Sequence, residues 1–519
     1  MASTPEPSSS HSPEGPVVVT EGGAVRGRRD GDIAEFRGIR YARAPIGPLR
    51  FRPPEPVPPW TGEYDATGYG PAAIQSVSML TAGSADTQSE DCLSLNIWTP
   101  ALGLEGGGAG LPVMVWIHGG SFTTGSGSIP WYEGANLARR GVVVVSINYR
   151  LGALGFLHLE SIFGAEAAGA ANLGLLDQAA ALAWVRDHIA PFGGDPARVT
   201  IFGESAGAMS VSTHLALPAS DGLFHHAIAQ SGAAAHVHDH DAGARICRLV
   251  LETLGVSTLP DLRALPAQAF VAATEAAEAA VAADPVLALP FSPTIDGSTL
   301  PDHPLVSLRP DISLLIGSNR DEMRLWEVLG QLAGTTVEID EGRLERRIRR
   351  TLEARGEALD PAAVIATYRS ARPDATPKDI DLAVGADLTF RIPAVRLLEA
   401  HGSHAPTFAY LFTHESTSMG GILGCAHATE IPFVFDNLHQ PGVELLVGDV
   451  TDERAALAAA LADTWVAFAV TGRPDPSPLG TWPVYEPGRR STMVIDLESS
   501  VVDDPSAEER RLWSGDEGL

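Results

Sequence analysis

The sequence predicts an α/β protein with a large, mostly parallel central sheet, and two observations support this prediction. First, Val113–Ile117 and Val142–Ile147 are continuous apolar runs, which are typical of strands buried on both faces. Second, apolar residues recur at helical spacing in Asp177–Ile189, between such runs. Strands that alternate with helices along a chain favour a parallel sheet covered by helices on both faces.

Further short apolar runs continue the strand series toward the C-terminus. They are Val199–Phe202, Ala227–Ala229, Ile312–Ile316, Phe408–Phe412 and Met493–Ile495. Near the N-terminus, three short strands are expected at Val17–Thr20, Gly23–Gly27 and Asp32–Phe36, followed by an irregular proline-rich loop over Pro45–Pro59. Two helical insertions are expected around residues 242–283 and 331–400, where Ala, Glu, Leu and Arg are abundant.

The first fifteen residues differ in composition from the rest of the chain. They are rich in Ser and Pro and lack the basic start and apolar core of a signal peptide. We therefore expect a disordered tail over 1–15, a single domain over 16–519 and a cytoplasmic location. Because no uninterrupted apolar stretch approaches the length of a membrane span, none is expected.

The charge and cysteine content exclude several classes of partner. A formal net charge of −28 repels nucleic-acid phosphates and anionic lipid. The three cysteines are too few and too scattered for a disulfide framework or a zinc site. We expect neither a metal nor an organic cofactor, and a monomer or a weak homo-oligomer.

The most informative motif is Gly203-Glu204-Ser205-Ala206-Gly207, directly after the apolar run that ends at Phe202. The pattern G-x-S-x-G is typical of a nucleophile elbow, in which a strand reverses sharply into a helix with one serine at the apex. Small residues are required on either side because the backbone approaches its neighbours closely there. The motif predicts Ser205 as the nucleophile of an α/β-hydrolase fold, with the Ala206 amide directed at the reacting oxygen.

A serine hydroxyl needs amide donors for the oxyanion, an imidazole base and a carboxylate that orients the base. The glycines of Ile117–Phe122 follow a buried strand, as in the H-G-G-type loop of esterases, so this loop is expected to supply donors; His118 is expected to be structural. The acid and the histidine should follow Ser205 in the chain. Asp321 and Glu322 both suit the acid.

Twelve histidines follow Ser205, and residue chemistry alone leaves about three of them as candidates for the base. His427 is favoured because a glycine-rich loop, Gly420–Ala426, leads into it.

Taken together, these segments resemble the type-B carboxylesterases, a family that includes bacterial esterases of the para-nitrobenzyl type and the cholinesterases. The resemblance covers nearly the whole chain after the tail. The segments that carry it, besides the elbow, are Phe36–Ala42, Gly47–Phe51, Ser89–Ile97, Asn148–Gly152, Asn172–Gln178, Phe192–Pro196, Ala229–Gly232, Thr294–Gly297 and Gly424–Glu430.

The resemblance implies Glu322, not Asp321, as the acid, and His427 as the base. It further implies oxyanion donors, residues of a second polar layer behind the triad, and leucines near the acyl pocket. The oxyanion donors would be the amides of Gly120, Ser121 and Ala206. The second polar layer would be the side chains of Glu204, Ser231 and Glu430, and the leucines near the acyl pocket would be Leu287 and Leu289. Ser121 stands where the family commonly has glycine.

The expected function is a serine carboxylesterase that hydrolyses small-molecule esters through an acyl-enzyme. The same machinery would serve amides or carbamates, so these alternatives stay open. Some members of the fold family are adhesion proteins without the triad, but all three triad positions are filled here. Arg50 with Glu90 and Arg150 with Asp177 are expected to form structural ion pairs, and the His236–His240 cluster is expected to be a surface segment, not a metal site.

Overall fold

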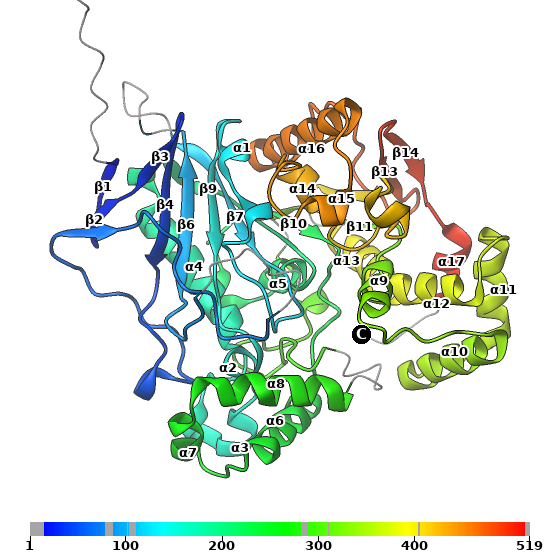
Figure 1. The fold of residues 1–519 in the computed structure, drawn as a ribbon, viewed down its shortest axis with the longest axis horizontal. Coiled ribbons are helices and arrows are strands. Elements are labelled where there is room, and N and C mark those ends of the chain that lie inside the picture. Colours follow the sequence, from blue (N-terminus) through cyan, green and yellow to red (C-terminus); the bar gives the residue numbers. More distant parts are fainter. Residues whose placement is uncertain are drawn as a thin grey trace, which may run out of the picture.

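The computed structural model describes residues 15–77, 87–100, 102, 110–281, 289–309, 311–402 and 405–513. Most of the tail expected over 1–15 therefore lies outside the described residues, as does part of the insertion expected at 242–283. The described residues form a central twisted sheet with helices on both sides and two groups of helices at its periphery (Figure 1).

The central sheet of the described chain has eleven strands, and its middle is parallel. All neighbouring pairs between β8 and β13 run parallel, whereas β3, β4, β6 and β14 add antiparallel edges. In spatial order the strands are β14 (Ser500–Asp503), β13 (Ser491–Ile495), β12 (Thr407–Phe412), β11 (Ser313–Asn319), β10 (His226–Gln230), β9 (Gly194–Glu204), β7 (Leu111–Ile117), β8 (Val143–Ile147), β6 (Ser94–Thr99), β4 (Ile33–Arg40) and β3 (Arg28–Asp30).

The expected strands are present, and β3, β5 (Glu63–Asp65), β6 and β14 are additions that the sequence did not predict. β6 is buried along its whole length and pairs antiparallel with both β4 and β8. Its polar Ser94 and Asn96 interrupt the apolar run that would have marked it as a strand. A small second sheet contains β1 (Val17–Thr20), β2 (Gly23–Arg26) and β5 (Glu63–Asp65).

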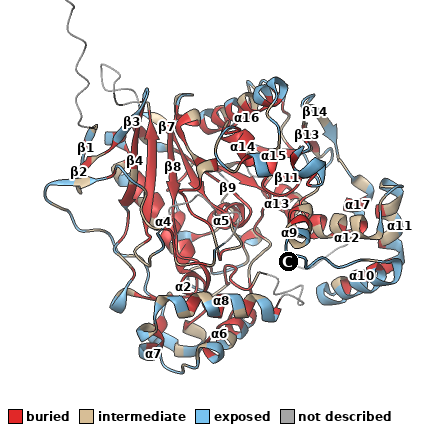
Figure 2. Ribbon diagram, viewed as in Figure 1, coloured by how far each residue is buried: buried red, intermediate tan, exposed pale blue. Residues whose placement is uncertain are grey.

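Successive side chains of the central strands point to opposite faces and so divide the core in two. Val113, Val115 and Ile117 of β7 pack into one apolar cluster, while Met114 and Trp116 pack into the other. Figure 2 shows the sheet as the buried centre, with exposed residues on the outer helices. The first cluster is covered mainly by α4 (Leu173–His188), α5 (Ala206–His214), α6 (His240–Leu254), α8 (Ala267–Val281) and α13 (Ile392–His401); the second by α1 (Ala135–Ala138), α14 (Ile431–Val434), α15 (Glu444–Val447) and α16 (Asp452–Thr471).

The helix α16 is the only described helix long and apolar enough to cross a membrane by composition. Its residues Leu461, Trp465 and Phe468 are buried in the second core cluster, against the sheet. Its apolar character is therefore that of a core helix, and it is no sign of a membrane span.

Two groups of helices lie at the periphery of the sheet, and each combines residues of an expected insertion with segments from elsewhere in the chain. α6 and α8 lie with α2 (Gly152–Gly155), α3 (Glu160–Phe163) and α7 (Leu259–Ala264) below the sheet in Figure 1. The second group has an apolar cluster of its own, around Leu344, Val364 and Ile380. It contains α10 (Glu341–Arg355), α11 (Pro361–Ala371), α12 (Pro377–Ala386) and α17 (Ala507–Leu512), next to α9 (Arg324–Leu332).

Candidate active site

Ser205 lies at the sharp turn between β9 and α5. Its backbone has φ 56° and ψ −126°, a conformation that non-glycine residues rarely adopt. The amide of Ser205 donates to the carbonyl of Gln230 at the end of β10, 2.9 Å away. Neighbouring strands thus hold the strained turn in place, with Ser205 at the N-terminus of α5.

The glycines on either side of this turn are required by close backbone contacts. A Cβ at Gly203 would lie 2.6 Å from the carbonyl oxygen of Ile117, and one at Gly207 would lie 2.0 Å from the same atom. Both distances are below any real Cβ contact, so side chains at these positions would push the turn away from β7. The close approach brings the elbow next to the loop that follows β7.

That loop supplies backbone donors beside Ser205. Gly120, Ser121 and Phe122 have φ angles of 112°, 54° and 61°, so three consecutive residues have positive φ. A Cβ at Gly119 would lie 2.9 Å from the Cβ of Ser205. Within the described residues, the amides of Gly120, Ser121 and Ala206 donate no hydrogen bond, which leaves all three available for an oxyanion.

The carboxylate of Glu322 and the imidazole of His427 meet behind the elbow. Oε2 of Glu322 lies 2.6 Å from Nδ1 of His427, and Oε1 accepts the backbone amide of Asn319 at 2.8 Å. Glu322 comes from the loop after β11 and His427 from the loop after β12, and both side chains are buried. A carboxylate can only accept from Nδ1, so this bond places a proton there and directs Nε2 away from Glu322.

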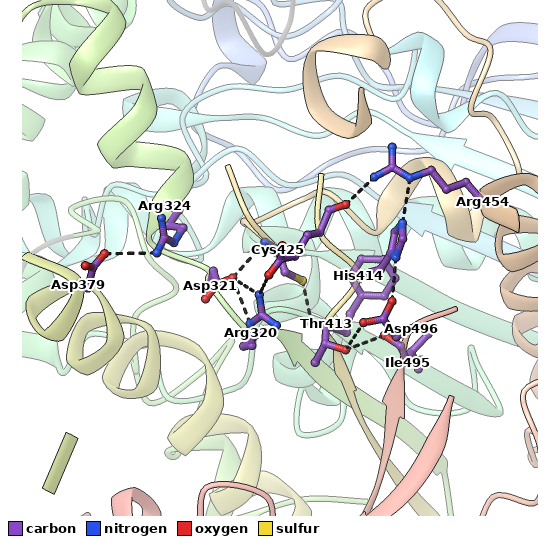
Figure 3. Close-up of polar contacts among 12 residues, drawn as sticks. Arg320, Asp321, Arg324, Asp379, Thr413, His414, Cys425, Arg454, Ile495 and Asp496 are labelled. Atoms are coloured by element: carbon purple, nitrogen blue, oxygen red, sulfur yellow. Dashed lines mark hydrogen bonds and ion pairs between the residues drawn. The ribbon is translucent and has the colours of Figure 1, made fainter. Parts of the chain in front are cut away.

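Asp321, the other acid that suited the chemistry, has different partners (Figure 3). Its carboxylate forms an ion pair with Arg320 and accepts the amide of Cys425 at 3.1 Å, while its own amide donates to the carbonyl of Cys425 at 2.9 Å. These bonds join the loop of Glu322 to the loop of His427. Asp321 therefore fixes the distance between the two loops, and Glu322 alone of the two acids pairs with His427.

Two other histidines near these loops have partners that exclude them as the base. His414 lies 2.8 Å from Asp496 through Nδ1 and accepts from Arg454 through Nε2 at 3.0 Å (Figure 3). His118 stacks on Tyr149 with ring centroids 4.5 Å apart, and burial lowers the pKa of His118 to about 4. Both imidazoles hold backbone and loops in place.

The other ring nitrogen of His427 faces Glu204, the residue before the nucleophile. Oε1 of Glu204 lies 2.9 Å from Nε2 of His427, at ion-pair distance but without the alignment of a hydrogen bond. Within the described residues, no hydrogen bond joins the hydroxyl of Ser205 to His427. Catalytic hydrogen bonds commonly tighten only when substrate binds.

Three buried carboxylates set the charge of this site. Burial alone lowers the pKa of His427, but the charges of Glu204 and Glu322 outweigh it and raise that pKa well above 6.5. Burial, together with the same two carboxylates, raises the pKa of Glu430 to about 8. Burial also raises the pKa of Glu204. The two carboxylates therefore favour the imidazolium form of His427, and Glu430 is mostly neutral near pH 7.

The comparison with known proteins identifies the family. The sequence model of the Carboxylesterase family matches residues 14–513. The chain belongs to the carboxylesterase family. It is 37% identical to the para-nitrobenzyl esterase of Bacillus subtilis (strain 168) over 95% of this chain and 98% of that protein. It is 33% identical to the phenmedipham hydrolase of Pseudarthrobacter oxydans, over 94% and 96% of the two chains.

Among solved structures, the carboxylesterase EST55 of Geobacillus stearothermophilus superposes with a TM-score of 0.84 at 38% identity, covering 96% of this chain and all of that one. These neighbours have the α/β-hydrolase fold that the sequence predicted. The chain is accordingly a carboxylic ester hydrolase.

Three other predicted site residues of this carboxylesterase have no contact in the structure that supports their predicted roles. Ser231 is buried with φ 51°, and its hydroxyl has no hydrogen-bond partner within the described residues, so the structure does not join it to Glu204 or Glu430. Leu289 is half-buried against the larger core cluster, and Leu287 lies outside the described residues. A role for either leucine in acyl binding stays a prediction.

The carboxylesterase site also contains residues that the sequence interpretation missed. The side-chain amide of Asn319 donates to Glu430 at 2.6 Å, and Gln230 donates to the other oxygen of Glu430 at 3.2 Å. The rings of Trp326 and Phe390 each have their centroid 4.8 Å from that of His427. Trp326 lies on α9, which begins two residues after Glu322, so it is close to the acid in the sequence. Phe390 has no comparable local signal.

The predicted structural pairs of the carboxylesterase are present. Arg50 binds Glu90, and Arg150 binds the buried Asp177 through two hydrogen bonds of 2.6 and 2.7 Å. The three cysteines are all buried and free. No group of three or more metal-ligating side chains occurs in the described part of the chain.

Proposed function

We propose that this carboxylesterase is a serine esterase in which Ser205, His427 and Glu322 form the catalytic triad. The observation that carries the proposal is the buried 2.6 Å contact between Glu322 and His427, directly behind a strained serine. The carboxylate holds the imidazole in the tautomer that leaves Nε2 free to take a proton from Ser205. Nε2 faces Glu204 in this structure, so it must turn to Ser205 for the transfer.

The reaction then follows from the geometry. Ser205 gives its proton to Nε2 of His427 and attacks the ester carbonyl, and the amides of Gly120, Ser121 and Ala206 stabilise the tetrahedral oxyanion. His427 returns the proton to the leaving alcohol. A water activated by the same imidazole then attacks the acyl-enzyme, and the acid leaves as the proton returns to Ser205.

Glu204 and Glu430 are proposed to act through His427 and not on the substrate. The Glu204 carboxylate lies beside Nε2 and stabilises the imidazolium that forms in each step. Glu430 is joined to Glu322 through Asn319, which contacts both carboxylates. An amide or carbamate would need the same proton transfers, so a panel of p-nitrophenyl esters and the matching anilides would measure the preference.

The test is hydrolysis of p-nitrophenyl acetate and butyrate by wild type and Ser205→Ala. Loss of the nucleophile should lower kcat on the order of 10⁶-fold, and the initial burst of p-nitrophenol that reports the acyl-enzyme should vanish. The matched control is Ser212→Ala, on the same helix, where a buried hydroxyl makes no hydrogen bond within the described residues. If Ser205→Ala kept activity within tenfold of wild type, the proposed triad would be wrong.

A further inference from the structure

A π-helical turn interrupts the helix pair α12 and α13 (Figure 1) at Asp387–Arg391. The amide of Ile392 donates to the carbonyl of Asp387, five residues back, where an α-helix would bond four residues back. Pro393 explains the widening, because it has no N–H to offer the carbonyl of Thr389. The turn is thus encoded by one proline, and it leaves the Thr389 carbonyl without its usual helical donor.

The freed carbonyl is bonded by a histidine from a distant loop. Nε2 of His236 lies 2.7 Å from the oxygen of Thr389. Burial lowers the pKa of His236, so the ring is neutral, and a carbonyl can only accept, which places the single ring proton on Nε2. The sequence analysis expected a surface segment at His236–His240, whereas His238 is buried and His236 joins the loop after β10 to the π turn.

The outer side of the turn is fixed by a buried polar network. Asp387 accepts two hydrogen bonds of 2.6 Å from Arg391 and one from the hydroxyl of Tyr368. That hydroxyl also accepts from the indole of Trp513 at 2.8 Å. The network joins the turn to α11 and to the C-terminal segment, so the turn cannot move independently of the helices behind it.

The inner side of the turn places an aromatic ring on the proposed catalytic base. Phe390 is 2% exposed, and its ring centroid lies 4.8 Å from that of His427 at an interplanar angle of 37°. The bond from Nδ1 to Glu322 fixes one atom of the imidazole but leaves the ring free to swing about it. Contact with Phe390 restricts that motion, together with contact with Trp326, whose ring centroid lies at the same distance of 4.8 Å.

We propose that Phe390, presented by the π turn and held there by His236, is a positioning residue that limits the motion of the His427 imidazole about its bond to Glu322, so that Nε2 stays near Glu204 and the adjacent Ser205. The inference rests on the proposed function of the triad. Phe390 acts through the imidazole and exchanges no proton with the substrate. Its effect is on how often the imidazole is correctly oriented, so it should appear in kcat and leave KM nearly unchanged.

The first test is Phe390→Leu, which keeps an apolar side chain but removes the flat ring. Because small misplacements of a catalytic group cost up to about 100-fold in rate, we expect kcat to fall about 10- to 100-fold and KM to change less than about twofold. The matched control is Phe270→Leu on α8, an equally buried phenylalanine whose ring packs on Phe51. That control should keep the kcat of wild type.

The second test acts on the hydrogen bond to the turn and does not alter Phe390. His236→Leu removes the donor to Thr389, whereas His236→Gln can place an amide N–H at the position of Nε2. We expect kcat to fall several-fold in His236→Leu and to return to within about twofold of wild type in His236→Gln, with KM unchanged in both.

Three results would overturn the inference: an unchanged kcat in Phe390→Leu, a loss confined to KM, or an equal loss of kcat in Phe270→Leu. If Phe390→Leu does not fold, equal kcat values in the two His236 variants would overturn it. Ser205→Ala is measured in parallel. An active Ser205→Ala refutes the proposed function, whereas an inert Ser205→Ala with an unaffected Phe390→Leu refutes the positioning role alone.

Discussion

The contact between Glu204 and His427 makes a quantitative prediction about pH dependence. At 2.9 Å and an effective dielectric constant of 20, the attraction between the carboxylate and the imidazolium is about 6 kcal/mol, which sets an upper limit of about 4 units for its effect on the pKa of His427. Opposite charges at this range usually shift a pKa by about 1–3 units. Glu204→Gln removes the charge and keeps the shape.

The sign of the effect follows from the role of the base. Only neutral His427 can accept a proton, so activity rises with pH through the pKa of His427, which Glu204 and Glu322 hold well above 6.5. In Glu204→Gln that pKa falls, and the acid limb of kcat/KM should move down by about 1–3 units. The plateau kcat should also fall, because the imidazolium of the transition state loses a counter-charge.

The assay is the pH profile of kcat/KM for p-nitrophenyl butyrate, with kcat measured at saturation for each variant. Glu430→Gln serves as the matched control for charge, because Glu430 is joined to Glu322 through hydrogen bonds of Asn319 and forms no ion pair with His427 within the described residues. Glu430 is mostly neutral below its pKa of about 8, so a neutral replacement should leave the acid limb below pH 7 within about 0.3 units of wild type. If Glu204→Gln kept both the acid limb and the plateau of wild type while folded, the proposed action of Glu204 through His427 would be wrong.

Two predictions concern stability. The pKa of Glu430 is raised from 4.5 to about 8 in the folded protein, so the folded state binds more protons than the unfolded state between these pH values. As pH rises from 4.5 to 8, the free energy of unfolding of wild type should therefore fall by up to roughly 5 kcal/mol relative to that of Glu430→Gln. Paired urea titrations would check this, and parallel curves for the two proteins would refute it. In the second prediction, Asp177→Asn should lower the free energy of unfolding by about 3–5 kcal/mol, because the buried charge of Arg150 then has no counter-charge. Asp187→Asn, which breaks the exposed pair with Arg186, should cost less than about 1 kcal/mol, and equal losses in the two variants would contradict the reasoning.

The elements that the sequence predicted well are those that local physics decides. The apolar runs at β7 and β8 can be satisfied only by strands buried on both faces, and the elbow needs glycine where the backbone meets Ile117. β6 was missed because Ser94 and Asn96 are buried there, and Asn96 bonds Gly38 of β4 and Ser146 of β8, so burial does not show as an apolar pattern. The helix α16 was missed as well, although Thr451 and Gly472 mark its two ends.

For the candidate site, too, the sequence predicted some residues, and only the structure could identify the others. Residue chemistry could name Ser205 but left both Asp321 and Glu322 open. They are adjacent in the sequence, and only the pairing of two loops shows that Asp321 bonds Cys425 while Glu322 bonds His427. The resemblance to a family had favoured Glu322, and the geometry supplies the physical reason for that choice.

By itself, then, the sequence determined the fold class, the family and the serine at the elbow, because each is carried by local patterns of residues: the apolar runs, the family segments and the glycines of the turn. Only the tertiary structure decided which carboxylates surround His427, and that Phe390, 37 residues before it in the chain, lies on its ring. Charge and packing act through space over a few ångströms, and the residues that share such a distance come from loops and helices whose proximity no local pattern records.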